Sequence, residues 1–281
     1  MKVDGGLKAD WLVIPGAVFI GLAFIVPLGL MIDRSFSGGA LANYGYALTA
    51  PHNLRSITYT LEVTALVVGL CILLGYPWAW LMTRASRLGQ MVMMAIVLVP
   101  FWSSLLVRSY AWTVILRDSG IVNQALALIS PAMRLQLMGN TTGTVIGMTQ
   151  ICLPFMILPV YAAMLRLDGN LLFASESLGA RPLTTFLRVY FPLTLPGVIA
   201  GSVLVLVVSL GFYITPTVLG HPYRLMISQL VVNEAVEMIS FGTASAMAVV
   251  LLILTLLMLA LVGRFVPVFQ QLGLDGAEER N

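Results

Sequence analysis

LDGNLLFASESLGARPLTTFLRVYFPLTLPG, residues 167–197, is a mixed polar and apolar stretch in a chain otherwise rich in hydrocarbon side chains. The sequence on both sides consists of long runs of Val, Ile, Leu and Met with scarcely a charge. Such runs suit the interior of a membrane, where a spanning helix needs about 20 apolar residues. We therefore expect residues 167–197 to lie outside the lipid, on a surface that another protein can reach.

The first half of this stretch carries the signals of two short helices joined by a tight corner. Asp168 or Asn170 is suited to cap a helix over LLFASESL. Gly179 is suited to end that helix in the left-handed conformation, and Pro182 to begin a second helix over PLTTFLRVY. The sequence therefore predicts a helix, a corner and a second helix.

The second half is expected to hold this element at a fixed angle beneath the membrane. Pro192 is predicted to break the second helix, and Pro196 to begin the next membrane span. Leu171, Leu172 and Phe173 would give the first helix an apolar side with few charges around it. A rigid element with such a side is suited to bind a partner and to transmit force.

The composition of the whole chain indicates a membrane protein. Hydrophobic residues make up 59% and charged residues 10% of the 281 residues, with a mean hydropathy of +0.96, whereas soluble domains have roughly 25% charged residues. The apolar runs lack the alternation of a β-barrel, so the expected fold class is an all-α integral membrane protein. We expect residues 1–281 to form a single transmembrane domain with six spans. The predicted spans are residues 11–32, 57–82, 90–113, 143–165, 196–219 and 241–263.

The distribution of Lys and Arg sets the expected orientation. An even number of spans places both termini on one side, and that side has more positive residues, which predicts cytoplasmic termini and a cytoplasmic 167–197 loop. The outer connections then lie near 33–56, 114–142 and 220–240, and IVNQALALI in the second of these is predicted to form a surface helix. The positive residues of the terminus side are Lys2, Lys8, Arg84, Arg87, Arg166, Arg181, Arg188, Arg264 and Arg280, against Arg34, Arg55, Arg117, Arg134 and Arg224 opposite.

Motifs for enzymatic chemistry are missing from the sequence. The two lysines, Lys2 and Lys8, lie outside any GxxxxGK[ST] motif, so the chain is not expected to hydrolyse ATP by that route. His52 and His221 have no Cys or acidic partner at metal-ligand spacing. The positive residues are scattered rather than gathered into a patch that binds nucleic acid. We expect no catalytic residue, cofactor, metal or nucleic acid, which leaves transport, channel or scaffold roles.

LLFASESLGARPLTTFLRVYFPLTLPG resembles the cytoplasmic signature of binding-protein-dependent ABC importer permeases. That signature is a Glu-Ala-Ala stretch, a Leu-Gly corner and a later Pro-Leu…Pro-Gly. Phe173 stands where the family usually has the Glu, and Ser175 replaces the second Ala, which changes the polar part of the motif and leaves its shape. The positions that fit are Ala174, Leu178, Gly179, Phe186, Pro192, Pro196 and Gly197.

Three further stretches narrow the resemblance. PFWSSLLVRSYAWTVILRDSGIVN, IGMTQICLPFMILPVYAAMLRLD and SLGFYITPTVLG are similar to segments of the spermidine/putrescine and opine-type permeases. The resemblance covers nearly the whole chain from about residue 55 onward. It implies the type I ABC importer permease fold, in a multi-pass protein of the bacterial inner membrane.

The resemblance also implies partners and a mechanism. A second homologous permease subunit, two ATP-binding cassette ATPase subunits and an outer solute-binding protein are expected, with ATP bound by the ATPases and not by this chain. The 167–197 loop would be the coupling helix that docks into an ATPase groove, and the permease would translocate spermidine, putrescine or another small organic solute by alternating access. The residues implied for ATPase coupling are Leu172, Phe173, Ala174, Ser175, Glu176, Leu178, Gly179, Ala180 and Arg181.

Polar and aromatic side chains inside the spans are candidates for the substrate pathway. Glu62 is the only carboxylate within a predicted span, and Arg108 falls at a similar depth, so the two can form an ion pair. Trp102 and Tyr110 can offer ring faces to an ammonium group. The alternatives are a structural or interfacial position for Glu62, a snorkelling Arg108, and membrane-interface positions for the aromatic rings.

Tyr213 and Thr215 complete the set of pathway candidates. Gly211 and Pro216 loosen the helix around them and free backbone carbonyls, which must be satisfied in a polar or protein-lined space. Two other functions stay open on the residues alone: a secondary transporter or channel, for which the chain shows no convincing internal repeat, and a membrane scaffold without a transported solute.

Overall fold

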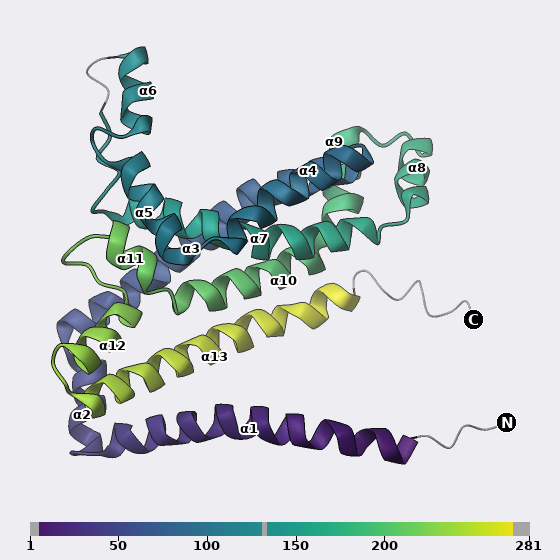
Figure 1. Ribbon diagram of the computed structural model, residues 1–281. Coiled ribbons are helices and arrows are strands. Elements are labelled where there is room, and N and C mark those ends of the chain that lie inside the picture. The colour runs from purple at the N-terminus through teal and green to yellow at the C-terminus, as the bar shows by residue number, and fades with distance from the viewer. Residues whose placement is uncertain (1–5, 131–133, 272–281) are drawn as a thin grey trace. The chain divides into compact units, whose positions relative to one another are not determined.

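The computed structural model describes residues 6–130 and 134–271, which are helical throughout their regular parts and contain no strand (Figure 1). Within these ranges, the side chains of residues 6–13, 40, 172, 176 and 265–271 lie outside the description. Lys2 and Arg280, two of the positive residues used for the predicted orientation, also lie outside the described residues. The predicted all-α class is confirmed.

The chain folds as two compact units. The first comprises Met1–Leu54 and Leu230–Leu252, and the second Arg55–Gln229 and Ile253–Asn281. Helices α3 (Pro51–Arg84), α12 (Ile227–Val236) and α13 (Phe241–Gln271) contribute residues to both units.

The first unit contains α1 (Gly6–Phe36), α2 (Ala40–Thr49) and parts of the shared helices. Ala47, Ala246 and Met247 form its small buried core. The Asn43 amide nitrogen donates to the carbonyl oxygens of Ser35 (3.0 Å) and Ser37 (2.9 Å), which fixes the turn between α1 and α2. The most apolar window of α1 has no buried side chain, as expected of a helix surrounded by lipid.

A polar cluster joins α2 to α12 in the first unit. The Tyr46 hydroxyl donates to Glu234 Oε1 at 3.2 Å and lies 3.0 Å from His52 Nε2. Burial and, to a lesser extent, the Glu234 carboxylate raise the pKa of Tyr46 above its usual value. The neutral phenol is therefore the form that the fold favours.

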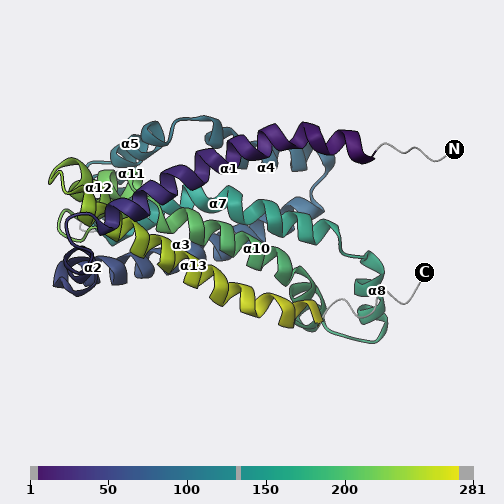
Figure 2. The same ribbon diagram turned by 90° about the horizontal axis from the view of Figure 1, so that it is seen from below.

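The second unit is built around two long helices that lie side by side (Figures 1 and 2). These are α7 (Thr141–Leu165) and α10 (Phe191–Leu210), and α3 packs against them through Val63, Val67 and Cys71. The other elements of this unit are α4 (Arg87–Leu98), η1 (Val99–Trp102), α5 (Leu105–Leu116), α6 (Ile121–Ile129), α8 (Gly169–Ser177), α9 (Pro182–Thr185), η2 (Phe186–Tyr190) and α11 (Ile214–Leu219).

Two glycines four residues apart let α10 approach α7 closely. A Cβ atom added at Gly197 would lie 2.5 Å from Ala163 Cβ and 2.7 Å from the Pro159 carbonyl oxygen. One added at Gly201 would lie 2.8 Å from Met156 Sδ. This is the small-xxx-small arrangement by which membrane helices pack where lipid provides no hydrophobic drive.

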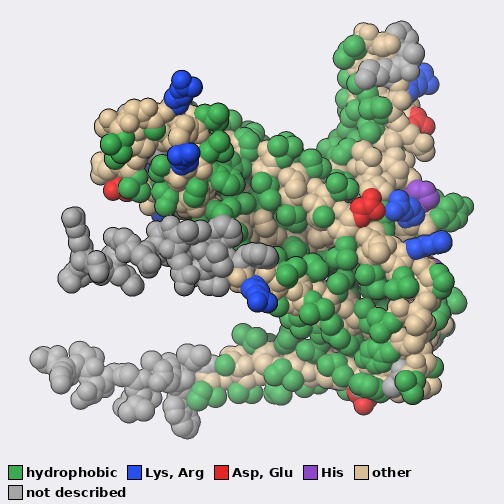
Figure 3. All heavy atoms as spheres, turned by 180° about the vertical axis from the view of Figure 1, so that it is seen from behind, with side chains coloured by type: hydrophobic (Ala, Val, Ile, Leu, Met, Phe, Trp, Pro, Cys, Tyr) green, Lys and Arg blue, Asp and Glu red, His purple; other side chains and the backbone are tan. Residues whose placement is uncertain are grey.

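Five described helices are long and apolar enough to cross a membrane, and a bent pair of helices adds a sixth if it counts as one span. The space-filling view shows hydrophobic side chains spread over the face that it displays, with only a few charged ones among them (Figure 3). Five of the predicted spans thus contain long helices, which are Ile14–Phe36, Pro51–Arg84, Thr141–Leu165, Pro182–Leu210 and Phe241–Arg264.

Residues 90–113, predicted as one span, do not form a continuous helix. The chain there forms α4 with η1 and then α5 with α6, and the two parts meet at a bend of 105°. Pro100 has no N–H to donate along the helix, and Ser103 is extended while its hydroxyl donates to the Pro100 carbonyl oxygen at 2.7 Å. The helix therefore ends at Ser103, one short turn after Pro100, and a new helix begins after Ser104. The predicted helix over IVNQALALI is confirmed as α6.

The prediction for residues 196–219 is wrong at both ends. Pro192 does not break the helix and Pro196 does not begin one, because a single helix runs from Pro182 to Leu210. Helix α10 instead ends at Leu210, before α11. Pro216 offers no N–H to the Phe212 carbonyl and its ring crowds that position, which disfavours a continuous helix there.

A wide helical turn explains how the helix tolerates Pro192. The five residues of η2 form a π-turn, in which the Phe191 N–H donates to the Phe186 carbonyl oxygen, five residues back. The wider turn directly precedes Pro192 and relieves the contact between the proline ring and the preceding turn of the helix. One wider turn thus accommodates Pro192 within the helix.

Candidate functional site

The 167–197 loop folds into the predicted helix, corner and helix. The Asp168 carboxylate accepts the Asn170 N–H at 2.9 Å and so caps α8. Of the two predicted candidates, Asp168 and Asn170, the cap is therefore Asp168. Gly179 has φ +79°, the left-handed conformation expected of it. The Ala180 N–H donates to the Ser175 carbonyl oxygen at 3.1 Å, a bond typical of the Schellman motif. Pro182 begins α9 as predicted.

Ser175 ties the two arms of the corner together. Its hydroxyl lies 2.9 Å from the Thr185 hydroxyl, and Thr185 is buried in α9. The Arg181 carbonyl oxygen accepts the N–H groups of Thr184 (2.8 Å) and Thr185 (3.0 Å), which closes the first turn of α9. The corner is therefore held by side-chain and backbone bonds on both sides.

Apolar side chains cover the outside of this corner. Phe173 is 69% exposed and Leu178 is 88% exposed, and Leu171 and Leu183 are exposed as well. Ala174 and Arg181 are exposed and Ala180 is half-buried. The side chains of Leu172 and Glu176, also predicted for this surface, lie outside the described residues. Apolar side chains that gather on a surface in this way form a candidate contact surface for another protein.

The aromatic side chains behind the corner connect it to α3. The ring of Tyr76 on α3 lies 6.0 Å from the Phe186 ring and 5.7 Å from the Phe191 ring, measured between centroids. Its hydroxyl lies 2.9 Å from the Thr194 hydroxyl in the interior. Displacement of the corner would therefore act directly on α3 and α10 together. The sequence alone gave no sign of this cluster, because its members come from distant segments.

At the other end of the α7 and α10 pair from α8, the chain carries α11 and the loop that follows it (Figures 1 and 2). Glu62 does not pair with Arg108 as predicted. Its carboxylate instead lies 3.3 Å from Arg224 Nη2 in that loop. Arg108 is half-buried, and its Nε has no hydrogen-bond partner within the described chain. Arg224 sits in a loop remote in sequence, and no spacing rule points to it.

The other pathway candidates do not gather around Glu62. Trp102 ends η1 and is 90% exposed, while Tyr110 on α5 is 61% exposed. Thr215 is buried, and its hydroxyl lies 3.0 Å from the Ser109 hydroxyl of α5. Tyr213 is half-buried at the start of α11. Of these described side chains, only Thr215 contacts a polar group of another helix, α5.

The predicted loosening of the helix near Gly211 is confirmed. The chain leaves α10 at Leu210 and begins α11 at Ile214. The Phe212 carbonyl freed by this break accepts a hydrogen bond from the Ser228 hydroxyl, which satisfies it in the interior.

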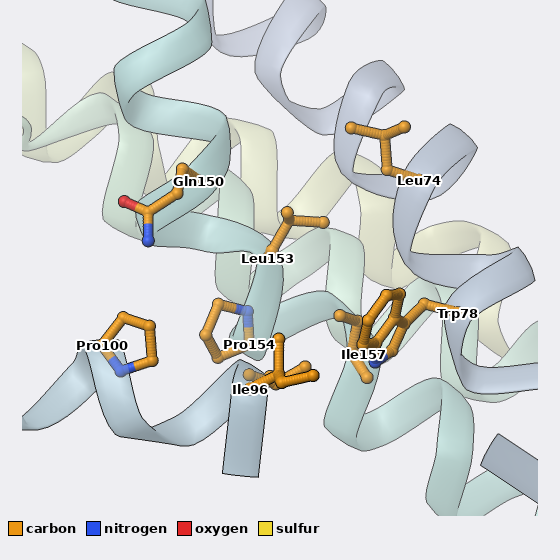
Figure 4. Close-up of a pocket in the computed structure, with 9 residues that line it drawn as sticks. Leu74, Trp78, Ile96, Pro100, Gln150, Leu153, Pro154 and Ile157 are labelled. Atoms are coloured by element: carbon orange, nitrogen blue, oxygen red, sulfur yellow. The ribbon is translucent and has the colours of Figure 1, made fainter. Parts of the chain in front are cut away.

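A cavity of about 380 Å³ lies between α3, α4 with η1, and α7 (Figure 4). Its walls are apolar, with the amide of Gln150 and the indole of Trp78 among them. Gln150 Oε1 accepts the Trp112 N–H at 3.4 Å, and Trp78 Nε1 has no partner within the described residues. The cavity offers no titratable group for chemistry and suits an apolar occupant.

Relatives of this chain among known proteins are membrane components of transport systems. Residues 70–270 match the family described as "Binding-protein-dependent transport system inner membrane component". The spermidine/putrescine transport system permease protein PotB of Escherichia coli (strain K12) is 29% identical over 255 residues, which are 89% of this chain and 91% of PotB. The inner membrane ABC transporter permease protein YdcU of the same organism is 36% identical over 232 residues, 78% of this chain and 74% of YdcU.

A solved structure has a similar fold. A chain of a bacterial ABC transporter involved in the import of the acidic polysaccharide alginate superimposes with a TM-score of 0.71, covering 92% of this chain and 96% of that one. The sequences are 18% identical, so this similarity concerns the fold alone.

Proposed function

The chain belongs to the inner membrane components of binding-protein-dependent transport systems, and from that premise we propose that it is the permease subunit of an ATP-driven importer of small organic cations such as spermidine and putrescine. The similarity to PotB over 89% of this chain supports spermidine and putrescine as the solutes. The chain is a transport component and not an enzyme, and it crosses the inner membrane several times.

The 167–197 loop is proposed as the site where an ATPase subunit docks. The exposed apolar side chains of α8 and its corner support this role, because contact with a partner would remove them from water. The stiff corner and the aromatic cluster around Tyr76 would carry a push from the ATPase into α3 and α10. Rocking against a second permease subunit would then expose the pathway alternately to each side.

The orientation follows from the same proposal. Arg84 ends α3 and Arg87 begins α4, and Arg181 and Arg188 lie in the 167–197 loop that carries α8. Positive residues favour the cytoplasmic side, so this end faces the cytoplasm together with both termini. The opposite end, with α11 and the loop after it, faces the outer solute-binding protein. Residues 1–281 would act as one membrane domain despite their two compact units.

Reconstitution tests the proposal. The purified chain in liposomes is expected to hydrolyse no ATP, and spermidine uptake is expected only when the cognate ATPase and solute-binding protein are added with ATP. Uptake without the ATPase would contradict the proposal, and so would uptake of sulfate or an acidic sugar in place of spermidine.

Two leucines of equal exposure provide a matched test of the docking surface. Leu178 at the corner is 88% exposed and Leu128 on α6 is 90% exposed. Leu178→Ser is expected to weaken binding of the ATPase subunit, whereas Leu128→Ser is expected to leave it unchanged. Equal binding by both variants would place the docking surface elsewhere.

A further inference from the structure

Tyr59, Glu62 and Arg224 form a cluster at the end of the second unit that is opposite α8. Tyr59 and Glu62 are three residues apart on α3, so they share a face of the helix. Arg224 Nη2 lies 3.3 Å from Glu62 Oε2, and Arg224 Cζ lies 4.7 Å from the centre of the Tyr59 ring. The guanidinium is thus held by a carboxylate on one side and by an aromatic ring on the other.

A carboxylate beside a ring face is a general binding site for organic cations. The carboxylate accepts charge-assisted hydrogen bonds from an ammonium group. The ring attracts the same cation through its quadrupole, as long as the cation lies within about 6 Å of the centroid. In this structure the cation that occupies the position is a side chain of the protein itself.

The Tyr59 ring is buried and fixed in place, whereas the ion pair beside it is half-exposed. Tyr59 is 3% exposed, and the neighbouring Thr60 hydroxyl accepts the Ile227 N–H at 2.9 Å, which anchors the chain after the loop to α3. The side chains of Glu62 and Arg224 are 50% and 53% exposed. An ion pair that is half in water is weak, so another cation can compete with Arg224 for the site.

We propose that Tyr59 and Glu62 form an outer site for one ammonium group of the transported organic cation, and that Arg224 occupies this site until the solute displaces it. The proposal rests on the function proposed above and names the site where the solute first meets this chain. The ligand class is a primary alkylammonium, with spermidine and putrescine as examples. An anionic solute would be attracted to Arg224 and repelled by Glu62, which is the opposite requirement.

Binding of radiolabelled spermidine to the full chain in nanodiscs of zwitterionic lipid tests the proposal at low ionic strength. Arg224→Met removes the competing charge and keeps an aliphatic side chain, so spermidine is expected to bind roughly two- to fivefold more tightly, the range that exposed ion pairs contribute. Glu62→Gln is expected to weaken binding by at least the same factor. The double variant is expected to bind more weakly than Arg224→Met and at least as tightly as Glu62→Gln, because the arginine also competes for the Tyr59 ring.

Arg55 provides the matched control. It is exposed on α3 two turns before Glu62, and Arg55→Met changes the net charge by the same amount. It is expected to leave spermidine binding unchanged, and Arg224→Lys is expected to bind as the wild type does. Thermal unfolding of each variant checks that it is folded. The proposal is overturned if Arg224→Met weakens binding or behaves like Arg55→Met, or if Glu62→Gln has no effect.

Uptake by the wild-type complex separates this proposal from the proposed function. If the complex fails to import spermidine, the proposed function is wrong. If it imports spermidine while the Glu62 and Arg224 variants bind as the wild type does, the proposed function stands and only the outer cation site is wrong.

Discussion

Replacement of Gly179 by alanine should weaken coupling through backbone strain alone. Gly179 has φ +79°, which an L-residue adopts at a cost of roughly 1–2 kcal/mol. No heavy atom lies within 4 Å of a Cβ added at this position, so the new methyl group meets open space. The corner should therefore be populated about 5- to 30-fold less in Gly179→Ala relative to competing conformations.

Gly169 at the start of α8 is the control for this substitution. A Cβ there also meets nothing within 4 Å, but its φ lies outside the left-handed region. Gly169→Ala therefore adds the same methyl group to the same loop without strain. Asparagine tolerates the left-handed conformation better than alanine does, and valine tolerates it less. The expected order of function at position 179 is Gly, Asn, Ala and then Val.

The assay is the affinity of the reconstituted chain for its ATPase subunit, together with ATP turnover stimulated by the solute-loaded binding protein. Gly179→Ala should raise the dissociation constant for the ATPase by up to about 30-fold, and Gly169→Ala should not change it. Equal behaviour of the two alanine variants would refute the reasoning, because they differ only in backbone conformation.

Three further predictions follow from packing and titration. Gly197→Ala should lower the thermal midpoint of the purified protein, because its Cβ would lie 2.5 Å from a neighbouring Cβ, whereas Gly69→Ala, with nothing within 4 Å, should not. Tyr76→Phe should destabilise the protein by about 1 kcal/mol in denaturant unfolding, because it removes the bond to Thr194. Burial and a nearby carboxylate raise the pKa of Tyr46. The contribution of the neutral phenol to stability is therefore complete below about pH 10 and is lost as the pH rises through the raised pKa. In this alkaline range, the thermal midpoint of Tyr46→Phe should fall less than that of the wild type.

Each of these predictions has an outcome that contradicts it. Equal thermal midpoints for the Gly197 and Gly69 variants would mean that α7 and α10 separate easily. Unchanged stability of Tyr76→Phe would mean that water replaces the lost hydroxyl. An identical alkaline stability profile for Tyr46→Phe would remove any role for this phenol in the pH response.

The sequence predicted the local structure of the 167–197 loop well, because short-range rules govern it. The cap at Asp168, the left-handed Gly179 and the helix start at Pro182 depend on residues a few positions away. Hydropathy likewise located the long apolar helices, since a spanning helix must satisfy its own backbone.

The failures concern prolines and long-range pairs. A proline can end a helix, bend it or be accommodated within it. The outcome depends on whether the chain nearby replaces the backbone hydrogen bond that the proline cannot donate. The helix ends after Pro100, at the extended Ser103, whereas the π-turn before Pro192 keeps the helix continuous. The pairing of Glu62 with Arg224 depends on a loop that lies 162 residues away, and no local pattern encodes it.

The π-turn also preserves the direction in which α8 points. Compared with a regular helix, η2 contains one additional residue, and each residue of an α-helix turns the chain by about 100°. Because the wide turn already holds that residue, its loss between Phe186 and Tyr190 would restore regular pitch and leave Phe173 and Leu178 near their present direction. Gain of a further residue would instead swing them around the axis of α10 by about that angle. The segment should therefore accept the loss of one residue more readily than the gain of one.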